Sequence, residues 1–144
     1  MLKGIPKIIS PELLKVLAEM GHGDRIVIAD GNFPAESVGK NAIVIRADGH
    51  GCAELLEAIL SLMPLDPYVE KSVKLMQVVP GDPVETPIWE EYAEIINRVG
   101  GCGRGVIGEV ERMAFYEEAR GAYAIIATSE SALYANIMLQ KGVI

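Results

Sequence analysis

The chain has 144 residues, of which half are hydrophobic, and its formal net charge is −7. This length and apolar content predict one domain, residues 1–144, whose core needs neither disulfides nor metal ions. Dispersed acidic residues argue against partners such as nucleic acid or anionic membranes, which attract clustered Lys and Arg. The longest apolar runs are well short of the roughly 20 residues that span a bilayer, and the first residues lack the apolar stretch of a secretory signal.

The predicted elements begin with a helix that starts after Ser10. Ser10 is suited to capping this helix, Pro11 suits its first position, and Gly21 fits a left-handed residue just past its end. Residues 25–30 read as a strand that is covered on both faces, because its apolar run is nearly continuous. A second strand is predicted over residues 42–46.

Helices and strands then alternate along the rest of the chain. The pattern predicts helices at residues 52–63, 87–99 and 112–120, and strands at 72–79, 105–110 and 122–128. The tail, residues 131–144, is open between a helical turn and a short strand. This alternation predicts a three-layer α/β fold with a largely parallel sheet and helices on both faces. In such folds, ligands bind outside the carboxyl ends of the strands.

Two cysteines, Cys52 and Cys102, are far apart in the sequence and match no Cys-x-x-Cys pattern. They predict free thiols in a reducing compartment, so we expect a cytoplasmic protein. The high apolar fraction also leaves hydrophobic surface that a soluble protein usually covers in an oligomer.

His22 and Asp30 flank the first predicted strand. Imidazole titrates near neutral pH and therefore suits proton transfer, and a carboxylate can orient it or bind a substrate hydroxyl. The residues alone leave a simpler interpretation open. His22 also suits a helix C-terminus, where the helix dipole favours a cation, and Asp30 also suits the start of a turn.

Three other motifs indicate structure rather than chemistry. His50 lies in a second Gly-His-Gly, but without a His-x-x-x-His pair or a cysteine cluster the two histidines do not indicate a zinc site. Arg46 and Asp48 are typical of a salt-bridged loop. The Gly-x-Gly-x-x-Gly run at residues 103–108 leads into a strand instead of opening a helix, so it predicts a turn and not a dinucleotide site.

Aromatic and polar residues gather in two segments, residues 112–116 and residues 134–136. Tyrosine and asparagine offer donors, acceptors and a flat apolar face, which are the groups that bind a sugar. The alternative is that these tyrosines pack as ordinary amphipathic residues at the edge of the core.

Several stretches from one end of the chain to the other carry a family resemblance. They are residues 9–24, Asp30-x-x-Phe33-Pro34-Ala35, Arg46-Ala47-Asp48-Gly49, Phe115-Tyr116-Glu117, and Tyr134-Ala135-Asn136-Ile137 with Lys141-Gly142-Val143. Together they resemble the D-ribose pyranase / L-fucose mutarotase family. The resemblance implies a sugar mutarotase, without cofactor or metal, that interconverts the α and β anomers of L-fucose. A D-ribose pyranase and a non-catalytic monosaccharide-binding protein are the alternatives.

The same resemblance implies roles for particular residues and an assembly. His22 is expected to be the proton donor and Tyr116 its catalytic partner. The expected sugar-binding residues are Asp30, Asp66, Met76, Arg112, Tyr134 and Asn136. Asn32 stands where many fucose mutarotases have a histidine, so we assign it no proton-transfer role. The family subunit is a compact α/β unit that forms a homo-oligomer, commonly a decameric ring.

The positions of His22 and Asp30 conflict with a site built within one chain. A strand rises about 3.3 Å per residue, so these two residues are expected to lie more than about 20 Å apart. Either the chain bends back, or a neighbouring subunit completes the site. We favour the site at a subunit interface.

Overall fold

The computed structural model describes all residues, 1–144, and its centre is a six-stranded sheet with the order β2-β5-β1-β6-β3-β4. The strands are β1 (Arg25–Ala29), β2 (Ile43–Ala47), β3 (Val73–Met76), β4 (Ile107–Val110), β5 (Ala124–Thr128) and β6 (Ile137–Gln140). Five strands are parallel to one another, and β6 runs antiparallel to its neighbours β1 and β3. The largely parallel sheet is thereby confirmed, and the tail forms a short strand.

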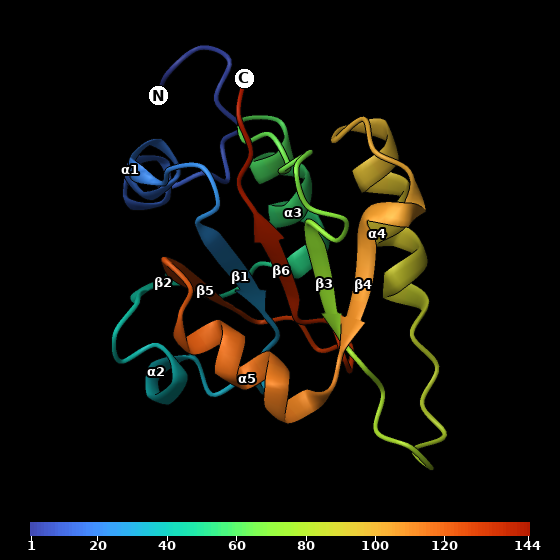
Figure 1. Cartoon of the computed structure of the whole chain (residues 1–144). Helices are drawn as coiled ribbons and strands as arrows, with labels where there is room; N and C mark the ends of the chain where they lie inside the picture. The colour runs from blue at the N-terminus through green and yellow to red at the C-terminus, as the bar shows by residue number, and fades with distance from the viewer.

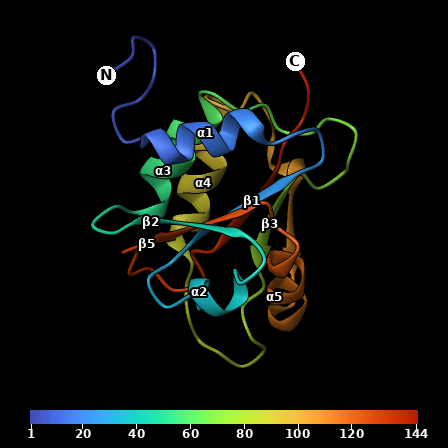
Figure 2. The same cartoon turned by 90° about the vertical axis from the view of Figure 1, so that its left-hand side faces the viewer.

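Helices cover both faces of this sheet (Figures 1 and 2). They are α1 (Pro11–Glu19), α2 (Ala35–Val38), α3 (Cys52–Leu60), α4 (Pro87–Arg98) and α5 (Arg112–Arg120). The larger core lies under α1, α3 and α4, and the smaller core lies under α2 and α5. The predicted three-layer arrangement is confirmed.

Strand β1 shows how the sequence divides between the two cores. Successive side chains of a strand point to opposite faces. Ile26 and Ile28 accordingly belong to the larger core, whereas Val27 and Ala29 belong to the smaller one. All four side chains are fully buried, which explains why the apolar run of this strand is continuous.

Helix α1 begins as predicted and ends differently. The Ser10 hydroxyl accepts a hydrogen bond from Leu13 N at 3.1 Å, which caps the helix. The prediction of a left-handed Gly21 is wrong, since the positive φ, 88°, occurs at Gly23. Gly21 N instead donates to the Asp24 carboxylate at 2.7 Å, so the reversal into β1 comes two residues later.

Other boundaries differ by a few residues. Helix α3 ends at Leu60, before the predicted end at Met63, and the short helix α2 is not predicted by the sequence pattern. Strand β3 ends at Met76 and not at Val79, because the following residues turn around Pro80 and Gly81. The glycine-rich run that resembles a dinucleotide motif is a turn: it holds the 3-10 helix η1 (Arg104–Val106), which leads into β4.

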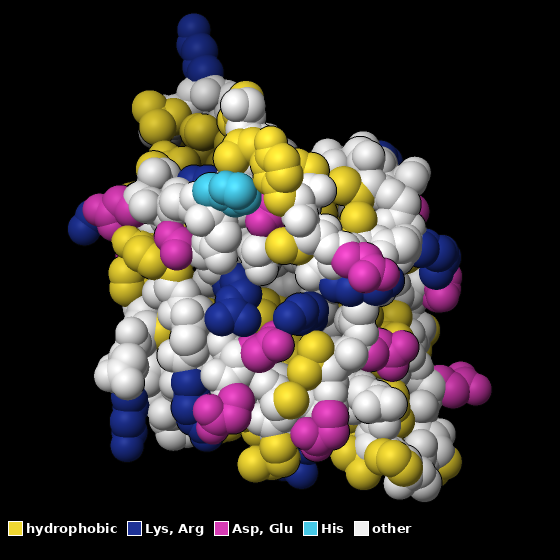
Figure 3. All heavy atoms as spheres, in the orientation of Figure 1, with side chains coloured by type: hydrophobic (Ala, Val, Ile, Leu, Met, Phe, Trp, Pro, Cys, Tyr) yellow, Lys and Arg dark blue, Asp and Glu magenta, His cyan; other side chains and the backbone are white.

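The surface agrees with the charge pattern of the sequence. Figure 3 shows acidic and basic side chains interspersed over one face, with hydrophobic side chains gathered near the chain ends. Exposed Met1, Leu2, Val143 and Ile144 are among the hydrophobic residues at those ends. No helix has the length and apolar character needed to cross a membrane. Cys52 and Cys102 are both free thiols, as predicted.

Candidate active site

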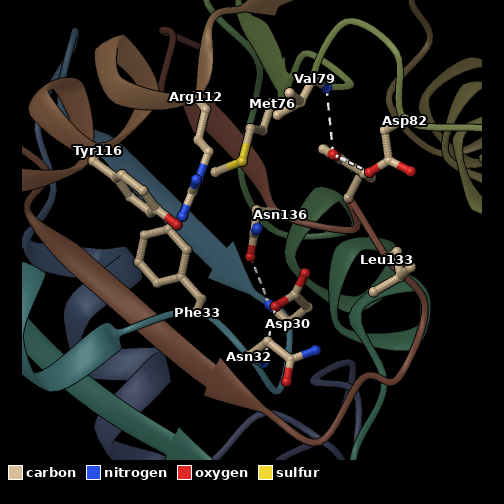
Figure 4. A pocket seen from close by; sticks show the side chains of 11 residues that line it. Asp30, Asn32, Phe33, Met76, Val79, Asp82, Arg112, Tyr116, Leu133 and Asn136 are labelled. Atoms are coloured by element: carbon tan, nitrogen blue, oxygen red, sulfur yellow. Dashed lines mark hydrogen bonds between the residues drawn. The ribbon is translucent and has the colours of Figure 1, made fainter. Parts of the chain in front are cut away.

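A cavity of about 260 Å³ lies at the carboxyl ends of β1 and β3, where β6 begins. It is lined by Asp30, Asn32, Phe33, Met76, Val79, Asp82, Arg112, Tyr116, Leu133, Tyr134 and Asn136. Figure 4 shows Arg112 and Tyr116 on one side of this cavity and Asp82 and Leu133 on the other. The place agrees with the expectation that ligands bind beyond the carboxyl ends of parallel strands.

Asp30 and Asn136 form one wall of the cavity. The Asn136 side-chain oxygen accepts a hydrogen bond from Asp30 N at 2.8 Å, and the Asp30 carboxylate accepts one from Asn32 N at 3.0 Å. Burial raises the pKa of Asp30, and the bond from the Asn32 backbone opposes that rise. The result is a buried carboxyl group of fixed orientation, suited to binding a ligand hydroxyl.

Helix α5 supplies Arg112 and Tyr116. These residues are four apart and therefore share one face of the helix. The Arg112 guanidinium carbon lies 5.6 Å from the centre of the Tyr116 ring, and the same ring packs on Phe33 with centroids 5.4 Å apart. Glu111 caps the first turn by accepting hydrogen bonds from the backbone, which fixes the position of Arg112. A hydrogen bond to Tyr116 raises the pKa of Arg112 above its ordinary value.

Tyr134 and Asp82 form the opposite wall. The Tyr134 hydroxyl donates to the Asp82 carboxylate at 2.7 Å. The backbone of Tyr134 has a φ of 55°, an unusual value for a residue with a side chain, and the Trp89 indole N–H donates to its carbonyl at 2.8 Å. Asp82, Val79 and Leu133 are not predicted as site residues. The only sequence signal for Asp82 is the Pro80-Gly81 turn that precedes it.

His22 lies at the other end of the sheet, in a cluster that we call the His22 cluster: His22, Asp66, Tyr68 and Gln140. His22 Nε2 is 3.1 Å from Asp66 Oδ1. Asp66 also accepts hydrogen bonds from Tyr68 N and from the Gln140 amide, each at 2.9 Å. The Tyr68 backbone bond is the main cause that lowers the pKa of Asp66. The Asp66 side chain is 2% exposed and that of His22 is 45% exposed.

This pairing suits the histidine to proton exchange with a ligand. An ionised Asp66 accepts the Nε2 proton of His22, which leaves Nδ1 as the nitrogen that gains or loses a proton. The position of Asp66 beside His22 depends on a close approach of the chain at Gly142. A Cβ atom there would lie 2.4 Å from the Leu65 carbonyl oxygen, so only glycine lets the segment that carries Asp66 pack against the end of β6.

The residues implied by the family resemblance therefore fall into two groups. The cavity brings together Asp30, Met76, Arg112, Tyr116, Tyr134 and Asn136. His22 and Asp66 meet at the opposite end of the strands, beyond the start of β1. The five residues of β1 and their flanking residues separate the groups by about 20 Å. The two groups do not form one site within a single copy of the chain.

Two other pairs are surface pairs. His50 lies 3.2 Å from Glu54, one helical turn away, and Arg46 donates to Asp48 at 2.8 Å. All four side chains are about half exposed or more. The prediction of a salt-bridged loop for Arg46 and Asp48 is confirmed.

The sequence pattern that defines the RbsD / FucU transport protein family matches residues 3–144. The chain belongs to this family.

Its similarity to members of the RbsD / FucU family extends over the whole chain. It is 52% identical over 147 residues to the fucose mutarotase of Homo sapiens, covering 99% of this chain and 94% of the relative. The crystal structure of FucU from Bifidobacterium longum has a TM-score of 0.96 and 65% identity, covering 99% of both chains. A fucose mutarotase from Streptococcus pneumoniae, solved in complex with L-fucose, has a TM-score of 0.93 and 51% identity, again covering 99% of both chains.

Proposed function

We propose that this protein is a sugar mutarotase that interconverts the α and β anomers of L-fucose by acid–base opening and closure of the ring. The observation that carries the proposal is the similarity, over 99% of the chain, to proteins named fucose mutarotase, one of them solved with L-fucose. The cavity supports the same conclusion, because its volume of about 260 Å³ is small and its lining mixes carboxyl, amide and phenol groups with aromatic faces.

Within this proposal, each cavity residue has a role in holding the sugar. Asp30 and Asn136 are adjacent polar groups for sugar hydroxyls. Asp30 is held in place because its own N–H donates to the Asn136 side chain and its carboxylate accepts a bond from Asn32 N. Arg112 and Tyr134 extend the polar wall, and Met76 supplies an apolar surface. Tyr116 stands between Arg112 and Phe33, where its ring can pack on the sugar and its hydroxyl can exchange a proton.

The proposed reaction needs a proton at one oxygen and the loss of a proton at another. His22 donates a proton to the ring oxygen. The Tyr116 hydroxyl accepts the proton of the anomeric hydroxyl and passes its own proton to water, or a water bound to Tyr116 takes that proton directly. The bond between the anomeric carbon and the ring oxygen breaks, the aldehyde rotates, and the ring closes on the other face with the reverse transfers. General acid–base catalysis of this kind contributes about 10²–10⁴-fold, and holding the open form in place contributes further.

The two groups of residues require two copies of the chain to make one site. We propose a homo-oligomer, with a decameric ring as the expected form, in which the His22 cluster of one copy faces the cavity of a neighbouring copy. The exposure of His22 supports this arrangement, since an imidazole that is 45% exposed is free to contact a neighbour. Residues 1–144 are proposed to act as one mutarotase domain in the cytoplasm, where the free thiols of Cys52 and Cys102 persist.

Saturation-difference proton NMR tests this function directly. Irradiating the anomeric proton of one L-fucose anomer transfers saturation to the other anomer only when the two exchange rapidly. The proposal predicts rapid exchange of L-fucose at catalytic protein concentration, and little change with D-glucose. Faster exchange of D-ribose than of L-fucose would favour the pyranase alternative. Binding of L-fucose without faster exchange would identify a sugar-binding protein and contradict the mutarotase.

A further inference from the structure

Asp82 occupies a position that its local sequence fixes rigidly. Asp82 N donates to the Val79 carbonyl at 3.0 Å, and Gly81 has a φ of 89°. Proline followed by a left-handed glycine is the pattern of a type II turn, in which Pro80 sets one φ and Gly81 adopts the other without strain. Asp82 is the last residue of this turn, and Pro83 follows it. The Asp82 carboxylate is therefore held at the wall of the cavity.

The hydrogen bonds of the Tyr134 hydroxyl are mostly committed to this turn. The hydroxyl donates its one proton to Asp82 at 2.7 Å and accepts a longer bond from Val79 N at 3.3 Å. A phenol hydroxyl has one proton and two acceptor positions. One acceptor position therefore remains for a ligand, and no donor remains. Figure 4 shows both bonds running from the turn, on one side of the cavity.

We infer that Asp82 is a positioning residue: by accepting the hydroxyl proton of Tyr134, it makes Tyr134 a hydrogen-bond acceptor for a sugar hydroxyl that donates. The inference rests on the proposed function, since the ligand concerned is the proposed sugar. Asp82 acts through Tyr134, and its effect is on which hydroxyl pattern the cavity accepts. It also excludes Tyr134 as an acid, which leaves proton transfer to His22 and Tyr116.

Tyr134 is held at both ends of the residue, at its backbone and at its hydroxyl. With a φ of 55° the residue occupies a conformation that needs support from its surroundings. Trp89 holds the carbonyl end and Asp82 holds the hydroxyl end. The bond to Asp82 also raises the pKa of Tyr134, while the positive charge of Arg112 acts in the opposite direction. The hydroxyl thus stays protonated, with its proton on the Asp82 side.

The test compares Asp82→Ala with Glu85→Ala, which removes an equal charge from an exposed position in the same loop. Titration calorimetry with L-fucose should give an affinity up to about tenfold weaker for Asp82→Ala, the order that one hydrogen bond from a sugar hydroxyl to Tyr134 contributes. Glu85→Ala should bind as the unmodified protein does. Asp82→Asn should recover most of the affinity, because its amide oxygen still accepts the Tyr134 proton.

A spectroscopic measurement separates positioning from a general structural effect. In ligand-free protein labelled at tyrosine Cζ with ¹³C, the signal that disappears in Tyr134→Phe reports the ionisation of Tyr134. Its pKa should fall in Asp82→Ala and stay unchanged in Glu85→Ala. Both readouts are independent of anomer exchange, so a protein that binds L-fucose without catalysis would defeat the proposed function and leave this inference standing.

The double variant gives the decisive comparison. Tyr134→Phe alone should weaken binding by about the same factor as Asp82→Ala, and combining the two should add nothing, since the residues act as one unit. If the double variant bound L-fucose more weakly by the product of the two single factors, the inference would be overturned. An affinity of Asp82→Ala equal to that of Glu85→Ala, or an unchanged Tyr134 pKa, would overturn it as well.

Discussion

His22 owes its proposed chemistry to a buried neighbour. Asp66 is almost fully buried, is held by Tyr68 N and the Gln140 amide, and presents an oxygen to Nε2 of the exposed imidazole. A carboxylate fixed in this way sets the tautomer and the orientation of the ring. His50 offers a natural comparison, because its partner Glu54 is itself exposed. The difference between the two histidines is the burial of the carboxylate.

Replacing His22 tests this assignment at the level of one residue. We expect His22→Ala to lower anomer exchange of L-fucose by about 10²-fold or more, because it removes the general acid, and to leave the size of the oligomer unchanged. NMR saturation transfer and size-exclusion chromatography measure the two properties. His50→Ala, the matched control, should exchange anomers as the unmodified protein does. Wild-type exchange in His22→Ala would show that another group supplies the proton.

Asp66 also predicts a pH dependence of stability. Its folded-state pKa lies below the ordinary value of 3.8, so the folded protein holds the ionised form more readily than the unfolded chain does. The resulting stabilisation is present above about pH 4 and is lost as the pH falls through the lowered folded-state pKa.

Asp66→Asn should therefore have a lower urea midpoint than the unmodified protein at pH 7, and the difference should narrow below pH 3.8. Glu85→Gln, which removes a charge at an exposed position, is the control and should shift the midpoint little. If the urea midpoint of Asp66→Asn stayed equally far below that of the unmodified protein at pH 7 and at low pH, the charge of the Asp66 carboxylate would not be the cause of the lost stability.

At the scale of elements, α5 joins the smaller core to the cavity. Phe115 is fully buried and meets Phe33 edge to face, with ring centroids 6.2 Å apart. Arg112 and Tyr116 flank it and line the cavity. The packing of one aromatic side chain thereby sets the position of two proposed site residues.

We expect Phe115→Ala to lower the free energy of unfolding by about 3–5 kcal/mol, the usual cost of removing a buried aromatic side chain. Urea denaturation at one fixed protein concentration measures it, since assembly contributes to apparent stability. Glu117→Ala changes a surface residue of the same helix, and should cost less than about 0.5 kcal/mol. Equal effects of the two substitutions would contradict the proposed packing of α5.

Local patterns predict the elements well and the contacts between distant segments poorly. The apolar run of β1 and the spacing of α5 predict both elements to within one residue, and Asp30 is correctly placed at a strand end. The bond between Asp30 N and Asn136 joins residues 106 positions apart. It exists because β6 inserts antiparallel between β1 and β3, a long-range pairing that periodicity does not encode. Asp82 reaches the cavity for the same kind of reason, through a turn whose partner, Tyr134, lies 52 residues away.

At the scale of the whole molecule, the sheet separates the proposed acid from the proposed sugar cavity. Asp30 follows the carboxyl end of β1, whereas His22 precedes the amino end of the same strand. A site that needs both groups requires a second copy, and its activity requires assembly. The proposed catalysis therefore depends on the proposed oligomerisation.

Dilution tests that dependence. Specific anomer-exchange activity should fall as the protein is diluted through the concentration at which the oligomer dissociates, and should return on reconcentration. Sedimentation velocity at the same concentrations gives the oligomeric state. Full specific activity in isolated monomers would contradict a site shared between copies.

Mixing two inactive variants tests whether one site takes His22 and Asp30 from different copies of the chain. His22→Ala retains the cavity and Asp30→Asn retains the acid, and each alone should exchange L-fucose anomers slowly. When the two are unfolded together, mixed in equal amounts and refolded, about a quarter of the shared sites should combine an intact His22 with an intact Asp30 from different copies. We expect recovery of up to about a quarter of the unmodified activity in the NMR exchange measurement. Mixed oligomers that remain as inactive as the separate variants would contradict it.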